Sequence, residues 1–297
     1  MSSQPVPYQS TLCYHAYTLW LFIASDVKSI VLPSTVFALA QASVEDGIGM
    51  REFTIRLPRT VAWILVNLLA FSVNNQRRQS AITEDGWNKP WRPLPSGRLT
   101  AATAKKLGWS TSILALVAGR VLGGGSIQGV LIAILSYLYN DGGMGNRNWL
   151  ARNLLNAGGM SSFAAGALSV TQQSPMSGKA TLHMTIVATV IWTTIHIQDL
   201  YGQAGDEKIG RRTVPLVIGD RATRATIDVA VMLWSVVVPV IHDAGHLESL
   251  PVLGLGVVVA GRTSSMKGVK DDVFTFSLYN VWLMAIYVFP LTAHGLG

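Results

Sequence analysis

Residues 180–199 read ATLHMTIVATVIWTTIHIQD and indicate the class of protein. The stretch is apolar over about 20 residues, which is the length of a helix that crosses a bilayer. Its last residue, Asp199, is its only Asp, Glu, Lys or Arg. No water inside a bilayer can satisfy free backbone groups, so we predict a transmembrane helix here.

The rest of the chain has the same character. Of its 297 residues, 49% are hydrophobic and 13% are charged, about half the charged share of an average soluble domain. This composition excludes a disordered chain, and the single cysteine excludes a disulfide framework. Eight further apolar segments lie at 27–43, 58–74, 103–122, 126–140, 152–171, 224–242, 249–262 and 273–293. We therefore predict one all-α domain over residues 1–297, a multi-pass membrane bundle of about nine transmembrane helices.

The N-terminal segment 1–26 precedes the predicted bundle at 27–293. Its first 17 residues contain no Lys or Arg, so we expect no cleavable signal peptide. Residues 14–25, YHAYTLWLFIAS, are apolar and aromatic. They predict an interfacial helix that leads into the first span.

The cationic residues are divided unevenly among the predicted loops. Of the 23 Lys and Arg residues, 17 lie in or beside the loops after the second, fourth, sixth and eighth helices. Only 5 lie in or beside the other four loops, and Lys28 is the remaining one. The positive-inside rule places the cation-rich loops in the cytosol. In a eukaryotic cell we expect the endoplasmic reticulum membrane.

Two acidic segments lie on this cation-rich side, one after the second predicted helix and one after the sixth. Each carries carboxylates, Glu84 and Asp85 in the first and Asp199 and Asp206 in the second. Because the segments are four helices apart, they indicate a duplicated unit whose two loops face each other across a central cavity. The seven-residue spacing of Asp199 and Asp206 would place both on one face of a continuing helix.

Such an arrangement suits the binding of a diphosphate. Magnesium takes oxygen ligands and is usually held by one or two carboxylates together with substrate phosphates. We predict that the four carboxylates hold Mg²⁺ and that nearby cations neutralise phosphate oxygens. The predicted diphosphate-binding residues are Lys89, Arg92, Lys208, Arg211 and Arg212, with Arg152 and Asn153 near a helix N-terminus. The alternative is that these residues only form interfacial ion pairs at helix ends.

The same loops resemble those of the UbiA superfamily of intramembrane prenyltransferases. The resemblance lies in KPWRPLPSG (89–97), YNDGGMGNRNWLARNLLNAGG (139–159) and GDEKIGRRTVP (205–215). It implies nine helices, acidic motifs after helices 2 and 6, and a polyprenyl diphosphate that is bound through magnesium and ionised. It also implies that Asn75 is a neutral oxygen ligand and that Asp85, Asp199 and Asp206 are needed for catalysis.

The chain departs from the family pattern at three positions. Gln76 and Gln79 stand where the first motif usually has Asp, and Gly202 stands where the second motif would have another Asp. With these changes the first loop resembles the fungal branch of the family, some members of which are terpene cyclases. This resemblance implies a membrane terpene cyclase acting on geranylgeranyl or farnesyl diphosphate. The alternatives are an aromatic prenyltransferase and a non-catalytic lipid-binding member.

A cyclase of this kind needs an apolar cavity that excludes water from the allylic cation, and aromatic faces stabilise such a cation. We expect two or three of eight candidates to line the cavity: Trp63, Phe71, Tyr137, Phe163, Trp192, Trp234, Phe276 and Tyr279. The expected partners are the prenyl diphosphate and membrane lipid, with no nucleic acid. The oligomeric state is left open.

Overall fold

The structure is a computed structural model that describes residues 12–265 and 268–295. Within these residues the regular structure is entirely helical. The long helices are α1 (Leu12–Ile23), α2 (Leu32–Glu45), α3 (Met50–Gln76), α5 (Ala101–Val121), α6 (Ser126–Asn140), α8 (Trp149–Gln172), α9 (Gly178–Thr194), α12 (Asp220–Ile241), α13 (His246–Ser264) and α14 (Val269–Gly295). Four short helices connect them: α4 (Gln79–Asn88), α7 (Met144–Arg147), α10 (Gln203–Lys208) and α11 (Val214–Ile218).

Each of the nine predicted segments is helical in the described residues, so the all-α prediction is confirmed. Five helical stretches are long and apolar enough to cross a membrane: Leu12–Glu45, Met50–Gln76, Gly178–Asp199, Asp220–Ile241 and Val269–Pro290. These stretches indicate an integral membrane protein. That all nine segments cross the bilayer stays a prediction.

The N-terminal helix continues into the first predicted span without a loop. A 3-10 turn, η1 (Ala24–Asp26), and a π-helical turn, η2 (Val27–Val31), connect α1 to α2. Such turns change the direction of side chains within a helix and are frequent at functional sites. The boundary predicted between residues 25 and 27 is therefore an irregular part of one helical run.

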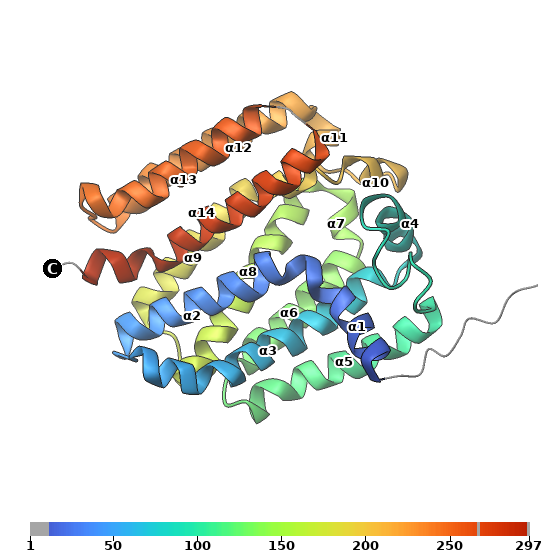
Figure 1. Ribbon diagram of the computed structural model, residues 1–297, viewed down its shortest axis with the longest axis horizontal. Coiled ribbons are helices and arrows are strands. Elements are labelled where there is room, and N and C mark those ends of the chain that lie inside the picture. The colour runs from blue at the N-terminus through green and yellow to red at the C-terminus, as the bar shows by residue number, and fades with distance from the viewer. Residues whose placement is uncertain (1–11, 266–267, 296–297) are drawn as a thin grey trace, which may run out of the picture.

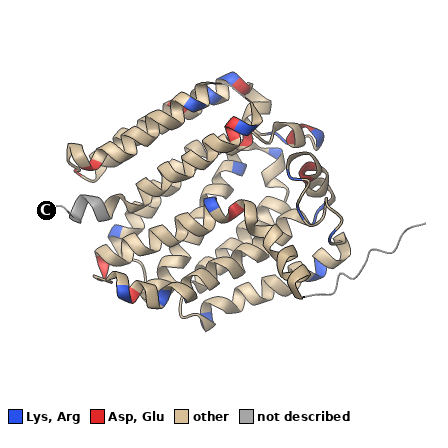
Figure 2. Ribbon diagram, viewed as in Figure 1, with Lys and Arg blue, Asp and Glu red and all other residues tan. Residues whose placement is uncertain are grey.

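The connections alternate between the two ends of the bundle. Figure 1 shows the short helices α4, α7, α10 and α11 together at one end, whereas the α2–α3, α5–α6, α8–α9 and α12–α13 connections lie toward the other. In Figure 2 charged residues are sparse along the middle of most helices and more frequent near their ends. The end with the short helices holds the loops that the charge count places on one side, including both acidic segments.

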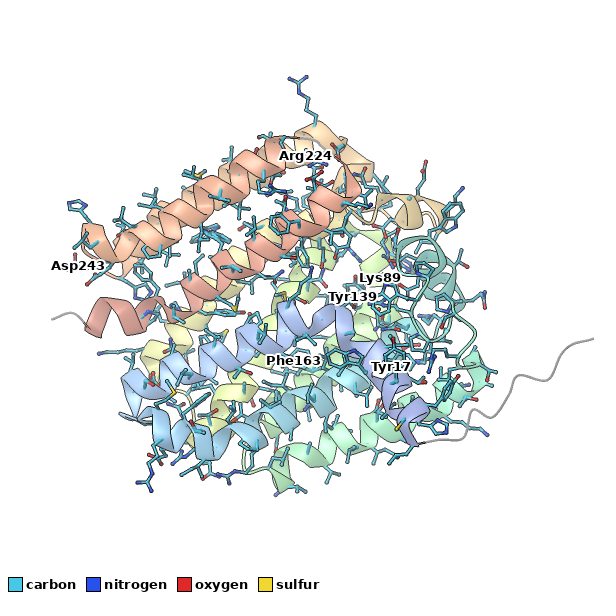
Figure 3. The ribbon with its side chains drawn as sticks, viewed as in Figure 1. Tyr17, Lys89, Tyr139, Phe163, Arg224 and Asp243 are labelled. Carbon is cyan, nitrogen blue, oxygen red and sulfur yellow. The ribbon has the colours of Figure 1, made fainter. Side chains whose placement is uncertain are left out.

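A buried ion pair fixes the last helices at this end. The Arg224 guanidinium donates to both oxygens of Asp272 (2.7 and 2.8 Å) and to the Asp220 carboxylate (2.7 Å). Arg224, which Figure 3 labels, lies in α12, and Asp272 lies at the start of α14. Removing one member of a buried pair is strongly destabilising, so these contacts hold the two helix starts together.

Candidate active site

A cavity opens between the bundle and the short helices. It contains about 1020 Å³ of space free of protein atoms, including its open mouth. Polar residues of the acidic loops line one part, among them Glu84, Lys89, Arg92 and Arg211. Apolar residues of the helices line the other part, among them Ile132, Leu155, Met160 and Phe163. Figure 3 labels Lys89, Tyr139 and Phe163, which line this cavity from α4–α5, α6 and α8.

The first acidic segment is folded around an ion pair. Helix α3 ends at Gln76, and α4 then carries Asp85 into a buried position. Nη1 of Arg92 donates to both Asp85 oxygens (2.8 and 3.0 Å), and Nη2 donates to Ser25 (2.9 Å). Burial raises the pKa of the Asp85 carboxyl, although the Arg92 charge opposes this.

The second acidic segment does not continue the preceding helix, so the expected single helix is wrong. After Thr194 the chain forms a 3-10 turn, η3 (Ile195–Asp199), and α10 begins only at Gln203. A 3-10 turn has three residues per turn, so the periodicity of an α-helix does not extend from Asp199 to Asp206. Asp199 accepts from Nε and Nη2 of Arg152 (3.2 and 2.9 Å) on α8.

The two segments nevertheless contact each other. Arg211 lies between them and pairs with Glu84 (2.6 Å) and with Asp206 (2.6 Å). The Asn88 side chain adds two hydrogen bonds across the same gap, donating to the Gly202 carbonyl (3.0 Å) and accepting from the Gly205 amide (3.1 Å). Residues more than 100 positions apart therefore meet at the mouth of the cavity.

Burial and the neighbouring charges together shift the pKa values of Glu84 and Asp206 in opposite directions. Burial alone would raise the pKa of the Glu84 carboxyl, but its ion pair with Arg211 lowers the pKa by more. Burial raises the pKa of Asp206 to about 6, against the opposing charges of Arg152 and Arg211. A cation added beside Asp206 would favour its ionised form and lower this pKa.

A model of the UbiA prenyltransferase family matches residues 29–283 of this chain. The chain belongs to this family. The resemblance carried by residues 89–97 and 205–215 is therefore confirmed. The described residues also bring the two acidic segments together at one cavity, as their spacing of four helices predicted.

Several proteins are similar over nearly their whole length. A somaliensene A/B synthase of Streptomyces somaliensis is 30% identical over 92% of this chain and 91% of its own. A fumagillin beta-trans-bergamotene synthase of Aspergillus fumigatus is 26% identical over 92% of this chain and 91% of its own. A polyprenyl transferase of Hericium erinaceus is 25% identical over 91% of this chain and 93% of its own. The solved structure of a UbiA homolog from Archaeoglobus fulgidus bound to GPP and Mg²⁺ has a TM-score of 0.64 at 10% identity, covering 92% of this chain and 99% of that one, which shows a shared fold.

The carboxylates of this UbiA-family site offer oxygen atoms, which are the ligands that magnesium prefers. Oδ2 of Asp199 is buried and has no hydrogen-bond partner among the described residues. A buried acceptor without a partner is costly, and an approaching cation would satisfy it. The described residues contain no group of three His, Cys, Asp or Glu side chains close enough to hold a metal. Glu84 lines the cavity, whereas Asp85, Asp199 and Asp206 lie outside the lining and are each paired with an arginine. Which carboxylates hold Mg²⁺ stays a prediction.

The other predicted polar residues fall into two groups. Lys89, Arg92, Arg152 and Arg211 line the cavity, and so does Asn75, whose amide donates to Asn140 (2.9 Å). Asn153 is buried outside the lining, and Lys208 and Arg212 are exposed outside it. The Lys208 ammonium lies over the Trp87 ring, 5.0 Å from its centroid. Contact of Asn153, Lys208 and Arg212 with a diphosphate therefore has no support from this geometry.

Three of the eight aromatic candidates line the cavity: Phe71, Phe163 and Phe276. Trp63 is fully buried and packs instead where Gly125 and Gly166 have no side chains. Tyr279 is also fully buried and its hydroxyl bonds to Thr194 (2.9 Å), while the Trp234 indole donates to Thr193 (2.9 Å). The remaining two, Tyr137 and Trp192, are exposed.

The structure adds lining residues that the sequence reasoning did not select. Tyr139 accepts a hydrogen bond from Arg152, and Asp26 reaches the cavity from the 3-10 turn η1. Gln198 and Asn156 contribute amides. A signal existed for Asp26, because a carboxylate between two apolar segments is costly in a membrane and is usually functional.

Proposed function

We propose that this UbiA-family protein is a membrane terpene cyclase. It would ionise geranylgeranyl or farnesyl diphosphate with Mg²⁺, cyclise the allylic cation to a hydrocarbon and release diphosphate. The observation that carries the proposal is the contact between the two acidic segments through Arg211, at the mouth of a cavity with an apolar interior. The synthase names of two similar proteins support cyclisation. The positive-inside rule supports loops that face the cytosol.

The charged mouth would bind and orient the diphosphate. Lys89, Arg92 and Arg211 face the same space as Glu84, so cationic groups are already in place where negative charge develops on the leaving group. Fixed charges of this kind stabilise a transition state without reorganisation. When bound by Glu84, Asp85, Asp199 and Asp206, with Asn75 as a neutral ligand, Mg²⁺ would supply further charge stabilisation for the departing diphosphate.

The apolar part of the cavity would hold the hydrocarbon chain. Phe71 and Phe163 meet edge to face, with ring centroids 6.4 Å apart, and Phe276 of α14 also belongs to the lining. An aromatic face within about 6 Å of a cation contributes roughly 0.5–2 kcal/mol. Burial among such side chains also excludes water, which would convert the cation to an alcohol.

The test is a reaction without an acceptor. Membranes that contain the protein are incubated with Mg²⁺ and geranylgeranyl or farnesyl diphosphate, and the extract is analysed for cyclic hydrocarbon. We expect a cyclic product. A product that forms only after a phenolic acceptor is added would favour the aromatic prenyltransferase; one similar protein is named a polyprenyl transferase. Binding of the diphosphate without Mg²⁺ and without turnover would indicate a lipid-binding protein.

Restoring a carboxylate at residue 202 should strengthen metal binding. A Cβ at Gly202 would lie 3.5 Å from Oδ2 of Asp206 and 3.6 Å from Nδ2 of Asn88, which are ordinary contacts. Its φ of −98° also suits any residue. For Gly202→Asp we therefore expect the Mg²⁺ concentration at half-maximal rate to fall about 3- to 10-fold, since each added carboxylate favours the ion. Gly202→Asn is the uncharged control, and an equal effect of both variants would contradict a metal role.

Replacing Arg92 by lysine should weaken substrate binding. Lysine keeps the charge but loses the planar pair of donors that contacts Asp85 and Ser25. We expect KM for the prenyl diphosphate to rise about 10-fold, which corresponds to one or two lost charge-assisted hydrogen bonds. The matched control is Arg147→Lys on α7, an exposed arginine outside the lining. An unaltered KM for Arg92→Lys would remove Arg92 from the diphosphate site.

A further inference from the structure

A second cavity lies between α3, α5 and α6. It contains about 700 Å³ of space, and its lining includes Ala70, Ala115, Gly129 and Ala133. Trp109 and Tyr137 also line it and are 68% and 62% exposed, so the cavity opens on the outer surface of the bundle. The neighbouring outer surface carries exposed apolar side chains such as Ile113, Leu116 and Ile134. In a membrane protein a surface of this kind faces lipid. We call this space the side cavity.

We call the cavity that Glu84 and Phe163 line the reaction cavity, and the side cavity shares a wall with it. Phe71, Ile132 and Ser136 line both spaces, so a single layer of side chains separates them. Ile132 is buried, and Phe71 packs edge to face against Phe163 on the side of the reaction cavity. Phe71 is only half-buried, and side-chain rotamer changes away from a fully packed core take picoseconds to nanoseconds. The wall is therefore thin enough to open by side-chain motion.

A second opening toward lipid would suit release of the product, because the product is an apolar hydrocarbon. A cyclised hydrocarbon that left through the mouth would pass Glu84, Lys89, Arg92 and Arg211 and would enter water. Exposing apolar surface to water costs about 25 cal/mol per Å². Through the side cavity the same molecule would pass a lining that is mostly apolar by area, although Asn67, Asn74 and Ser112 belong to it, and would then enter lipid. The charged groups in this lining do not oppose that route, because Arg77 and Asp141 pair with each other (2.9 Å) and Lys105 is exposed.

We propose that the side cavity is a second hydrocarbon-binding site, which receives the cyclised product past Phe71 and passes it into the bilayer. The inference rests on the proposed cyclase function. It separates two exits: diphosphate leaves through the charged mouth, and the hydrocarbon leaves between α3, α5 and α6. Blocking the side cavity should therefore slow product release and leave the chemical step unchanged.

The test uses a reversible block. Cys13 is the only cysteine of the chain, so Cys13→Ser gives a reference protein without thiols. Ala133→Cys in that background places one thiol in the side cavity, where residue 133 is exposed. The protein is treated with decyl or with methyl methanethiosulfonate, and dithiothreitol then removes the label. Ile134→Cys is the matched control, because Ile134 is the next residue of α6, is 50% exposed and lines neither cavity.

Two rates distinguish release from chemistry. With the decyl label at residue 133, we expect the multiple-turnover rate to fall about 10-fold and the single-turnover rate to stay within about 2-fold, because slow release limits only the former. Dithiothreitol should restore the rate, and the methyl label and the Ile134→Cys control should have little effect. Unchanged rates, or an equal fall in both, would overturn the inference. A reference protein that forms no cyclic hydrocarbon even in a single turnover would overturn the proposed function, and the inference with it.

Discussion

Membranes that contain the Asp206→Asn variant should form cyclic hydrocarbon at less than about one hundredth of the wild-type rate, the loss typical of one electrostatic group in a catalytic site. Asp206 is buried beside Arg211 (2.6 Å), and its neighbour across the cavity mouth is Glu84. The amide keeps the shape of the side chain but removes its negative charge. Without that charge the site loses a predicted ligand of Mg²⁺. Product is measured at saturating Mg²⁺ and saturating prenyl diphosphate.

The matched control is Asp243→Asn. Asp243 is exposed between α12 and α13, away from the short helices, as its label in Figure 3 shows. Its φ is +50°, a conformation that Asn adopts about as well as Asp, so the substitution should not disturb the turn. We expect wild-type turnover from this variant. A wild-type rate from Asp206→Asn would remove Asp206 from the catalytic machinery and would leave the metal assignment without its second segment.

Arg211→Met should have an effect of similar size for a different reason. Arg211 contacts three elements, through Glu84 on α4, Asn146 on α7 (2.8 Å) and Asp206 on α10. Methionine removes the charge that lies between the two acidic segments and leaves their carboxylates buried without it. We expect turnover to fall about 100-fold. Breaking a buried ion pair should also lower the free energy of unfolding by about 3–5 kcal/mol. Both are measured on purified protein in detergent.

Two further variants separate the functional loss from the structural one. Arg224→Met removes a comparable buried arginine that pairs with Asp272 and does not line the cavity. It should lose similar stability but keep its single-turnover rate at a temperature where it is folded. Arg211→Lys keeps a point charge and should recover part of the activity. If Arg211→Met and Arg224→Met lose activity in parallel with stability, Arg211 has only a structural role.

Hydropathy and motif spacing predicted most of the fold, because a bilayer allows few solutions for an apolar segment. The acidic segments were predictable for a similar reason, since carboxylates are rare in this chain. The 3-10 turn at Ile195–Asp199 was not, because its residues continue the apolar pattern of α9. The sequence also did not show which aromatic residues line the cavity. Trp63 packs against Gly125 and Gly166, and no local pattern reveals a contact across about 60 to 100 residues.

The partners of the carboxylates also lay beyond sequence reasoning. Both Glu84 and Asp206 were candidate ligands, but nothing local shows that Arg211 pairs with both at once. Asp26 was missed because a helix boundary was expected there, whereas the π-helical turn after it keeps the helical run continuous and leaves its side chain in the cavity lining. Long-range packing decided these positions.

The arginine–carboxylate pairs have a consequence for the order of binding. In the protein alone, Asp85, Asp199 and Asp206 are each neutralised by a guanidinium group. A divalent ion that arrives by itself competes with that internal partner. A diphosphate that arrives with it offers the displaced guanidinium a new anion, so each ligand raises the affinity for the other by the same factor. If these carboxylates are the metal ligands, we expect the protein to hold little Mg²⁺ in the absence of the diphosphate.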